Sequence, residues 1–379
     1  MLDPREFYRN LVNNGFTFFT GVPDSLLKSF CTVLEEVGNK SNHVITANEG
    51  NALSVAAGYY LATSNPAVVY LQNSGLGNIV NPLLSLTDSM VYKIPALLII
   101  GWRGEPGLKD EPQHERQGMV TLELLRVLGI EYTVIDGNCS NEEMEVVLSS
   151  ISKKMREDLA PYAIVVRKNT FESYSVARDS SDDALLTRER AVEVIINHIE
   201  EEAVVVSTTG KTSRELFEIR EKHNLGHGQD FLTVGSMGHC SQIALGISMV
   251  HKSLPVYCID GEGSLLMHMG SLAINGDYAS DYFTHIVINN GVHDSVGGQP
   301  NSAQQMDIGK MASASGYKFS YSVEGEKGLI QALEEVKKHR GSSMLEIRVK
   351  PGSRKDLGRP TLSPKTNKEE LMKYLSQIT

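Results

Sequence analysis

The sequence predicts an α/β protein with two doubly wound parallel-sheet domains of similar topology. Short apolar runs alternate with helical stretches along the chain, which is typical of a parallel sheet covered by helices on both faces. This alternation occurs in each of two halves of similar size. The length of 379 residues also fits two domains of ordinary size better than one.

The first half is predicted to begin with a helix and then to alternate between strands and helices. Apolar, β-branched or aromatic runs identify the strands, and Asp24 or Ser25 is expected to cap the second helix. The expected elements are, in order, a helix over 4–14, a strand over 16–20, a helix over 26–37, a strand over 43–46, a helix over 51–63, a strand over 68–71, a helix that follows the Gly-rich loop 72–78 and ends near Ser89, and strands over 95–101, 134–136 and 163–167.

The segment 102–118 interrupts this order. It contains several Gly and Pro residues and carries the basic side chains of Arg103, Lys109, His114 and Arg116 directly after an expected strand. Open α/β sheets bind their ligands at such strand ends. We interpret the segment as a ligand-binding loop, with a solvated connection as the alternative.

A polar, acidic stretch separates the two halves and is interpreted as a linker. The predicted domains are residues 1–175 and 188–379, joined by residues 176–187. The elements expected in the second half are a helix over 188–199, a strand over 203–206, a helix after a Gly-containing turn, a strand over 231–234, a helix that ends near Val250, a strand over 255–259, a helix over 265–278, a strand over 283–288, a helix over 307–315, a strand near Lys318, a helix over 328–339 and a strand over 343–349.

The composition excludes several classes of protein. The net charge of -10 argues against a nucleic-acid binder, and it requires any anionic substrate to find a locally basic pocket. The four cysteines show no CxxC spacing, which favours reduced thiols over a disulfide framework or zinc site. The first ten residues are polar, and no apolar run approaches membrane length. We therefore expect a soluble cytoplasmic protein with no membrane partner.

The stretch from Asp260 to Gly291 carries the strongest chemical signal. A Gly-rich turn between an expected strand and an expected helix offers free backbone N–H groups to an anion. The following strand delivers Asn290 to the carboxyl edge of what is expected to be the same sheet. Side-chain oxygens of Glu262 and Asn290, with a nearby backbone carbonyl, are ligands that Mg²⁺ accepts alongside phosphate oxygens. An ordinary crossover with a Gly turn is the alternative.

This stretch resembles the fingerprint of thiamine-diphosphate enzymes, which is Gly-Asp-Gly, a spacer, and Asn-Asn. The corresponding residues are Gly261-Glu262-Gly263 and Asn289-Asn290. Glu262 replaces the usual metal-binding Asp, keeping its charge and adding one methylene group. A P-loop around Thr209-Gly-Lys-Thr212 is set aside because position 205 is Val rather than Gly, although Lys211 or the backbone of this turn remains a candidate phosphate contact.

An enzyme of this kind also needs a carboxylate that shares a proton with the aminopyrimidine of the cofactor. Glu49 is the candidate, because it lies at an expected strand-to-helix junction in the first domain. A helix N-terminus and partial burial can tune its acidity there. The alternative is that Glu49 only interacts favourably with the dipole of its helix.

Further motifs resemble more specifically the phosphonopyruvate decarboxylase family and the related sulfopyruvate decarboxylases. The resemblance covers residues 16–350 and implies a fold with only a pyrimidine-binding and a diphosphate-binding domain, in an assembly of at least two identical subunits. The motifs that carry it are Gly21-Val-Pro-Asp-Ser-Leu-Leu-Lys28, Asn48-Glu-Gly-Asn51, Gln72-Asn-Ser-Gly75, Trp102-Arg-Gly-Glu-Pro-Gly107, Asp110-Glu-Pro-Gln-His114, Ser236-Met-Gly-His239 and Asn290-Gly-Val-His-Asp-Ser-Val-Gly-Gly-Gln299.

The resemblance implies decarboxylation of 3-phosphonopyruvate to phosphonoacetaldehyde with thiamine diphosphate and Mg²⁺, and it implies roles for individual residues. The metal would be held by Glu262, Asn290 and the Val292 carbonyl. The cofactor would contact Glu49, Asn73, the Gly235 carbonyl, Met237, Gly261, Gly263, Ser264 and Asn290. Asp24, Ser25, His114 and His293 are candidates for proton transfer or orientation, and Arg103, Lys109 and Arg116 for binding the substrate anion.

Three other functions are weighed against this one. Sulfopyruvate decarboxylation is the main rival, because a sulfonate differs little from a phosphonate in what a sequence reveals. A protein that binds the cofactor without catalysis is less consistent with the presence of Glu49 and the basic segment. A carboligase of the acetohydroxyacid type is also less consistent, since nothing indicates a flavin site or a third domain.

Overall fold

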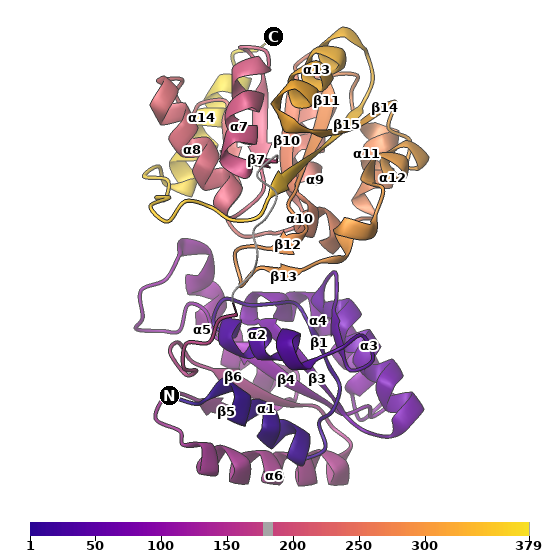
Figure 1. Cartoon of the computed structure of the whole chain (residues 1–379), viewed down its shortest axis with the longest axis vertical. Coiled ribbons are helices and arrows are strands. Elements are labelled where there is room, and N and C mark those ends of the chain that lie inside the picture. The colour runs from indigo at the N-terminus through magenta and orange to yellow at the C-terminus, as the bar shows by residue number, and fades with distance from the viewer. Residues whose placement is uncertain (177–184, 379) are drawn as a thin grey trace. The chain divides into compact units, whose positions relative to one another are not determined.

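The computed structural model describes residues 1–176 and 185–378. The chain divides into two compact units, Met1–Arg178 and Asp179–Thr379, and each contains a parallel sheet with helices on both faces (Figure 1). This confirms the predicted fold class. Of the predicted linker, residues 177–184 lie outside the described residues, and Leu186–Thr187 form the short strand β7.

The first unit has a six-stranded sheet in the order β2-β1-β3-β4-β6-β5, and every pairing is parallel. Successive residues of a strand point to opposite faces. In β3, Val68 and Tyr70 therefore belong to one apolar cluster, and Val69 and Leu71 to another. The strands are β1 (Phe19–Gly21), β2 (His43–Ile45), β3 (Ala67–Gln72), β4 (Ala96–Gly101), β5 (Glu131–Ile135) and β6 (Tyr162–Val166).

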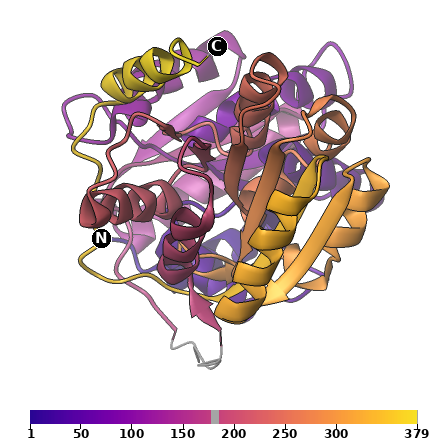
Figure 2. The same cartoon turned by 90° about the horizontal axis from the view of Figure 1, so that it is seen from above.

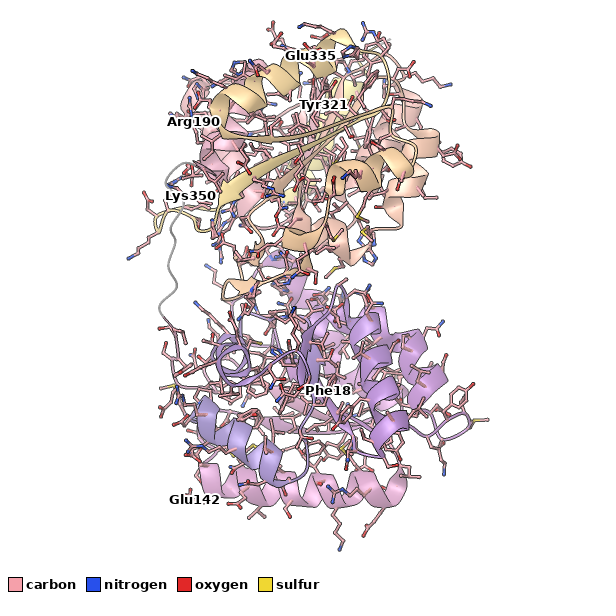
Figure 3. All side chains as sticks on the ribbon, turned by 45° about the vertical axis from the view of Figure 1, so that its right-hand side comes forward. Phe18, Glu142, Arg190, Tyr321, Glu335 and Lys350 are labelled. Carbon is pink, nitrogen blue, oxygen red and sulfur yellow. The ribbon has the colours of Figure 1, made fainter. Side chains whose placement is uncertain are left out.

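Helices cover the two faces of this sheet separately. Helices α1, α2 and α6 contribute to one cluster, and α3, α4 and α5 to the other. Phe18, labelled in Figure 3, stacks on Tyr59 of α3 with ring centroids 4.4 Å apart. The helical segments are α1 (Pro4–Asn13), α2 (Lys28–Val37), α3 (Glu49–Thr63), η1 (Asn73–Gly75), α4 (Leu76–Pro82), η2 (Leu83–Thr87), α5 (Pro112–Val127) and α6 (Asn141–Asp158).

The second unit repeats this topology. Its main parallel path runs β9-β8-β10-β11-β15-β14, and β7 adds to β15. If the six strands of each path are numbered from 1 to 6 in the order in which they occur along the chain, the spatial order is 2-1-3-4-6-5 in both sheets. The predicted similarity of the two halves is therefore confirmed. The strands are β7 (Leu186–Thr187), β8 (Val204–Ser207), β9 (Asp230–Leu232), β10 (Val256–Gly261), β11 (Phe283–Asn289), β14 (Phe319–Glu324) and β15 (Ser343–Lys350).

Helices again lie on both faces of the second sheet (Figure 2). Helices α7, α8 and α13 pack on one face, and α9, α11, α12 and α14 on the other. An antiparallel pair, β12 (Val292–His293) and β13 (Gln299–Pro300), follows β11. The helical segments are α7 (Arg188–His198), α8 (Lys211–His223), α9 (Cys240–Val250), α10 (Glu262–Met267), α11 (Ser271–Tyr278), η3 (Ser302–Gln305), α12 (Ile308–Ala314), α13 (Gly325–Lys338) and α14 (Pro364–Leu375).

Several local expectations were wrong. The expected loop 102–118 ends early, because Pro112 occupies the first turn of α5 and favours a helix start there, so His114 and Arg116 are helical. The expected helix 265–278 is two helices separated by a break that contains Gly270. Neither Asp24 nor Ser25 caps α2, because Leu27 is its N-cap residue and no side chain caps it. The Asp24 carboxylate instead accepts hydrogen bonds from the N–H groups of Leu26 and Leu27, just before the helix. Helices α6 and α14 were not predicted.

Candidate active site

Glu49 is a buried carboxylate at the first position of α3, directly after the segment that follows β2. Its Oε2 accepts a hydrogen bond of 2.7 Å from Asn78 Nδ2. Its Oε1 lies against Gly75, where a Cβ would overlap the carboxylate. Within the described parts of the chain Glu49 forms no ion pair, so an amide and a glycine hold it in place. Such a carboxylate can accept or share a proton with a bound ring nitrogen.

Arg103 follows β4 and is already paired within its own segment. Its guanidinium donates two hydrogen bonds to the Asp110 carboxylate, one from Nε at 2.8 Å and one from Nη2. A third hydrogen bond, of 3.0 Å, runs from Nη1 to Ser25 Oγ. The hydrogen bonds to Asp110 raise the pKa of Arg103. Burial tends to raise the pKa of Asp110, but hydrogen bonds from Arg103 and Gly104 outweigh it and lower that pKa. The structure thus brings Ser25 and Arg103 together.

The other basic residues of this region differ in their surroundings. Lys109 and Arg116 are exposed. His114 is half-buried in the first turn of α5, and its Nδ1 has no hydrogen-bond partner among the residues that the structure describes. Burial, together with the charge of Arg103, lowers the pKa of His114, so its imidazole is neutral near pH 7.

Asp24 and Asn73 hold neighbouring strand ends together. The Asp24 carboxylate is fully buried and accepts hydrogen bonds from the Leu26 N–H (2.8 Å) and from Gln72 Nε2 (2.6 Å). Asn73 donates from Nδ2 to the Arg103 carbonyl (2.8 Å) and to Thr121 Oγ1 (2.9 Å). Both side chains have internal structural partners, and their roles toward cofactor or substrate stay predictions.

In the second unit, Glu262 begins α10 at the end of β10, and its side chain is buried. Its Oε1 accepts a 2.7 Å hydrogen bond from Asn301 Nδ2, and its Oε2 a weaker one of 3.4 Å from the Asn290 N–H. No ion pair reaches Glu262 in the portion of the chain that the structure describes. Burial raises the pKa of Glu262 to about 7. A buried carboxylate without a cationic partner is suited to a divalent cation, which favours its ionised form.

The other proposed metal ligands belong to the turn that follows β11. Asn290 Oδ1 accepts a 3.0 Å hydrogen bond from the Val292 N–H, which shapes this turn. A carboxylate, an amide oxygen and a backbone carbonyl form a set of hard oxygen donors, which fits Mg²⁺ completed by phosphate oxygens and water. The donor chemistry of Glu262, Asn290 and Val292 is therefore compatible with the predicted metal.

Gly235 and Met237 lie in a turn with three positive-φ residues: φ is 70° at Gly235, 46° at Ser236 and 88° at Gly238. The Gly235 N–H donates to Thr209 Oγ1 (3.0 Å) and the Gly238 N–H to Ser264 Oγ (3.0 Å). Ser264 thus ties this turn to α10 through its side chain. Its backbone role at a diphosphate stays a prediction.

Met237, Gly263 and His293 meet at the start of α10. A Cβ built on Gly263 would lie 3.6 Å from both Met237 Cε and His293 Nδ1. Burial lowers the pKa of His293 to about 4, so this imidazole is neutral near pH 7. A neutral imidazole beside the glycine turn can donate or accept one proton. The structure thus brings together the predicted residues Met237, Gly261, Glu262, Gly263, Ser264, Asn290, Val292 and His293 around the ends of β10 and β11.

A network that the sequence did not reveal holds the loop after β12. Asp294 Oδ2 accepts from Arg188 Nη1 at 3.0 Å and from Lys211 Nζ at 3.3 Å. Arg188 also makes a two-hydrogen-bond ion pair with Glu215, at 2.7 and 2.8 Å. Lys211, which the sequence suggested as a phosphate contact, is thus paired with Asp294. No sequence spacing links these residues, because they come from separate elements.

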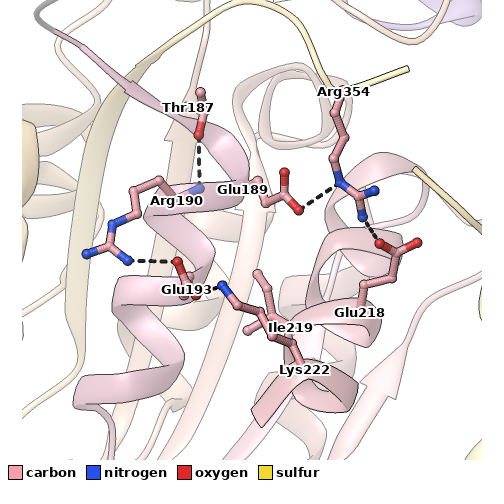
Figure 4. A pocket seen from close by; sticks show the side chains of 8 residues that line it. All are labelled: Thr187, Glu189, Arg190, Glu193, Glu218, Ile219, Lys222 and Arg354. Atoms are coloured by element: carbon pink, nitrogen blue, oxygen red, sulfur yellow. Dashed lines mark hydrogen bonds and ion pairs between the residues drawn. The ribbon is translucent and has the colours of Figure 1, made fainter. Parts of the chain in front are cut away.

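A pocket of about 450 Å³ lies beside α7 and α8 and contains none of the predicted site residues (Figure 4). Its charges neutralise one another, since Glu193 pairs with both Arg190 and Lys222, and Arg354 pairs with Glu189 and Glu218. The pocket therefore offers no unpaired charge for an anionic substrate.

Comparisons with known proteins identify both units. The N-terminal TPP binding domain of thiamine pyrophosphate enzymes matches residues 5–124, and the C-terminal TPP binding domain matches residues 208–347. Phosphonopyruvate decarboxylase from Streptomyces viridochromogenes is 33% identical, covering 96% of this chain and 92% of the relative. The enzyme of the same name from Streptomyces hygroscopicus is also 33% identical, with the same coverage.

A more distant relative is sulfopyruvate decarboxylase from Methanosarcina acetivorans, which is 26% identical over 80% of this chain and 81% of its own. The two phosphonopyruvate decarboxylases match along nearly their whole length, and both cofactor-binding domains are present in this chain. The chain therefore belongs to the phosphonopyruvate decarboxylase family of thiamine pyrophosphate enzymes.

Proposed function

We propose that the protein decarboxylates 3-phosphonopyruvate to phosphonoacetaldehyde and CO₂, using thiamine diphosphate and Mg²⁺. The observation that carries this proposal is the buried Glu49 carboxylate at the N-terminus of α3, in a chain related over nearly its whole length to phosphonopyruvate decarboxylases. We place the reaction in phosphonate biosynthesis in the cytoplasm. The four cysteines are free thiols, which suits a reducing compartment. Among the described residues, no helix is long and apolar enough to cross a membrane.

The protein side of the mechanism follows from its carboxylates and its turns. Thiamine diphosphate, when bound, supplies a nucleophilic carbon and an electron sink for the pair that the leaving CO₂ abandons. Glu49 would hold the proton shared with the aminopyrimidine nitrogen. Glu262, Asn290 and the Val292 carbonyl would hold the metal, and the N–H groups of Gly263 and Ser264 would face the diphosphate. His293, neutral and half-buried, is the candidate in the second unit for orienting substrate or moving a proton.

The substrate carries several negative charges, so its site needs positive groups. Arg103 is paired with Asp110, yet its five N–H donors exceed the three hydrogen bonds that it makes. Lys109 and Arg116 are exposed and can turn toward a bound anion. We therefore propose that Arg103 donates directed hydrogen bonds to the substrate anion. Lys109 or Arg116 would supply most of the positive charge that attracts this anion. Ser25, held by Arg103, would orient the substrate beside His114.

We also infer a homo-oligomer with active sites formed between subunits. Exposed apolar side chains gather on α3, on η2 and on the loop after η2, close in sequence to the elements that hold Glu49. Leu61 is 74% exposed and Met90 is 92% exposed, which a second subunit would relieve. The exposed apolar residues of this region are Val55, Leu61, Leu84, Met90, Val91 and Tyr92.

The test is CO₂ release by the purified protein with thiamine diphosphate and Mg²⁺, offered phosphonopyruvate, sulfopyruvate and pyruvate in parallel. Glu49→Gln is the control, because it keeps the shape of the side chain and removes the carboxylate. Preference for phosphonopyruvate, lost in the variant, would support the proposal. Turnover of sulfopyruvate alone would keep the mechanism and change the substrate, which the Methanosarcina relative makes the second candidate. Tight cofactor binding without turnover would favour a non-catalytic protein.

A further inference from the structure

Glu262 is one methylene group longer than the aspartate of the family fingerprint, and a further residue holds its carboxylate. The extra methylene adds one carbon–carbon bond, about 1.5 Å, and one more torsion that must be fixed. In the structure the Glu262 side chain is held by Asn301, whose Nδ2 donates to Oε1 at 2.7 Å. Asn301 lies beyond β13 and was not a predicted site residue.

Asn301 is itself held rigidly on the turn that carries the other metal ligands. Its backbone N–H donates to the Gly291 carbonyl at 3.0 Å. Its Oδ1 accepts a 3.0 Å hydrogen bond from the Ala303 N–H and thereby caps η3. Gln304, within η3, donates from Nε2 to the same Gly291 carbonyl at 3.2 Å. The Asn301 amide is therefore fixed relative to the turn at Asn290 before it contacts Glu262.

Because Oε1 of Glu262 is bound to Asn301, the other carboxylate oxygen, Oε2, is directed toward Asn290. It accepts a hydrogen bond of 3.4 Å from the Asn290 N–H. The two contacts restrict the position of the carboxylate and hold it against the turn that follows Asn289. Partners that orient a metal ligand in this way commonly contribute a factor of about 10 to 100 to metal affinity.

We propose that Asn301 is a positioning residue that holds the longer Glu262 side chain as a metal ligand, so that metal affinity in this protein depends on the Glu262–Asn301 pair. The inference rests on the proposed function, because it assumes that Glu262 binds the metal. A shorter aspartate at position 262 would not reach Asn301 and would bind the metal independently of it.

The experiment is a double-mutant cycle read by Mn²⁺ binding. Free Mn²⁺ is measured by electron paramagnetic resonance in the presence of thiamine diphosphate, with the full-length protein and with Asn301→Ser, Glu262→Asp and the double variant. Serine retains a hydroxyl that can cap η3 but cannot donate to Glu262. Gln304→Ala is the matched control, because it removes another side-chain bond to the Gly291 turn without touching Glu262. Thermal unfolding of each variant verifies that it is folded.

We expect Asn301→Ser to weaken Mn²⁺ binding about 10-fold or more in the Glu262 protein and by less than about twofold in the Glu262→Asp protein. Equal losses in both backgrounds, or a loss equal to that of Gln304→Ala, would mean that Asn301 only stabilises the loop and would overturn the proposal. Unchanged Mn²⁺ affinity of Asn301→Ser would overturn it as well, while leaving the proposed decarboxylation intact. If the unmodified protein releases CO₂ but binds no Mn²⁺, the metal assignment and the role of Asn301 both fail.

Discussion

Gly75 and Glu49 are in such close contact that a side chain at position 75 would displace the Glu49 carboxylate. A Cβ there would overlap this carboxylate, so the Glu49 side chain would have to move. Gly75 closes the short helix η1 that follows β3, and Glu49 opens α3, so two neighbouring βα turns fix the carboxylate between them. The position of the proposed proton-sharing group therefore depends on a glycine from another turn.

This contact predicts that Gly75→Ala displaces Glu49 and impairs catalysis more than folding. A shift of about 1 Å in a catalytic group can reduce activity about 100-fold. Gly77→Ala is the control, because a Cβ at Gly77 would meet no atom of the described residues within 4 Å apart from its chain neighbours and the backbone of its own helix. The measurement is kcat/KM for phosphonopyruvate in both variants. Similar activity of Gly75→Ala and Gly77→Ala would show that the position of Glu49 is not critical.

A second prediction concerns Arg103. Its ion pair with Asp110 is mostly shielded from solvent, with side-chain exposures of 19% and 16%. Removing a partner of such a charged hydrogen-bond pair costs about 1.5 to 3 kcal/mol. Arg103→Ala is therefore expected to lower the free energy of unfolding by this amount in urea denaturation and to reduce discrimination between phosphonopyruvate and pyruvate.

Lys109→Ala is the matched comparison for Arg103→Ala, because Lys109 is exposed. It is expected to raise KM for phosphonopyruvate without changing the free energy of unfolding. If Arg103→Ala left both stability and substrate discrimination unchanged, the ion pair and the proposed substrate contact would both be dispensable.

A third prediction concerns pH and His43. Burial lowers the pKa of His43 from 6.5 to about 4, and its Nε2 lies 2.8 Å from the Tyr70 hydroxyl. Because the folded pKa is below the unfolded one, the unfolded chain binds more protons between these values. The free energy of unfolding must then fall as the pH drops from about 6.5 to about 4, by up to about 3 kcal/mol from this group.

The measurement for His43 is urea denaturation of the protein and of His43→Gln at several pH values. Glutamine cannot titrate, so the variant should lose less stability on acidification than the unmodified protein. Parallel pH curves for the two proteins would contradict the neutral state of the half-buried His43.

The fold was predictable because its signals are local. Apolar runs such as that of β10 and the glycine turns after them identify strands and crossovers without knowledge of the partner strands. The candidate residues near positions 262 and 290 were predictable because consecutive parallel strands end at the same edge. Contacts between distant segments were not predictable in this way. Asn301 meets Glu262 across 39 positions, and no periodicity links them.

The pairing of Arg103 with Asp110 shows another limit. The sequence shows that both residues lie in one segment, but it does not show whether the arginine is paired with the aspartate or free to bind a ligand. Only the fold shows that Asp110 also accepts from the Gly104 N–H and thereby turns its carboxylate toward Arg103. Helix α6 was missed although Ser140 and Glu143 form a capping box at its start, a local signal that was available in the sequence.

The last prediction concerns Asp294, which anchors the loop after β12 to α7 and α8. Its Oδ2 accepts from Arg188 and Lys211, and the charge of Lys211 and the Arg188 hydrogen bond lower its pKa despite burial. Asp294→Asn keeps the shape of the side chain and removes its charge, so the loop that carries Val292 and His293 should lose its fixed position. We expect thiamine diphosphate, measured by calorimetric titration with Mg²⁺, to bind about tenfold more weakly.

Glu326→Gln is the matched control for Asp294→Asn, since Glu326 also pairs with an arginine, Arg190, but at an exposed position. Exposed ion pairs contribute at most about 1 kcal/mol, and this one is not attached to the loop. The control should therefore bind the cofactor like the unmodified protein. Equal cofactor affinities of the two variants would show that the Asp294 network stabilises the second unit without positioning its site. A loss of cofactor affinity in Asp294→Asn alone would show that Arg188 and Lys211 support the cofactor-binding loop.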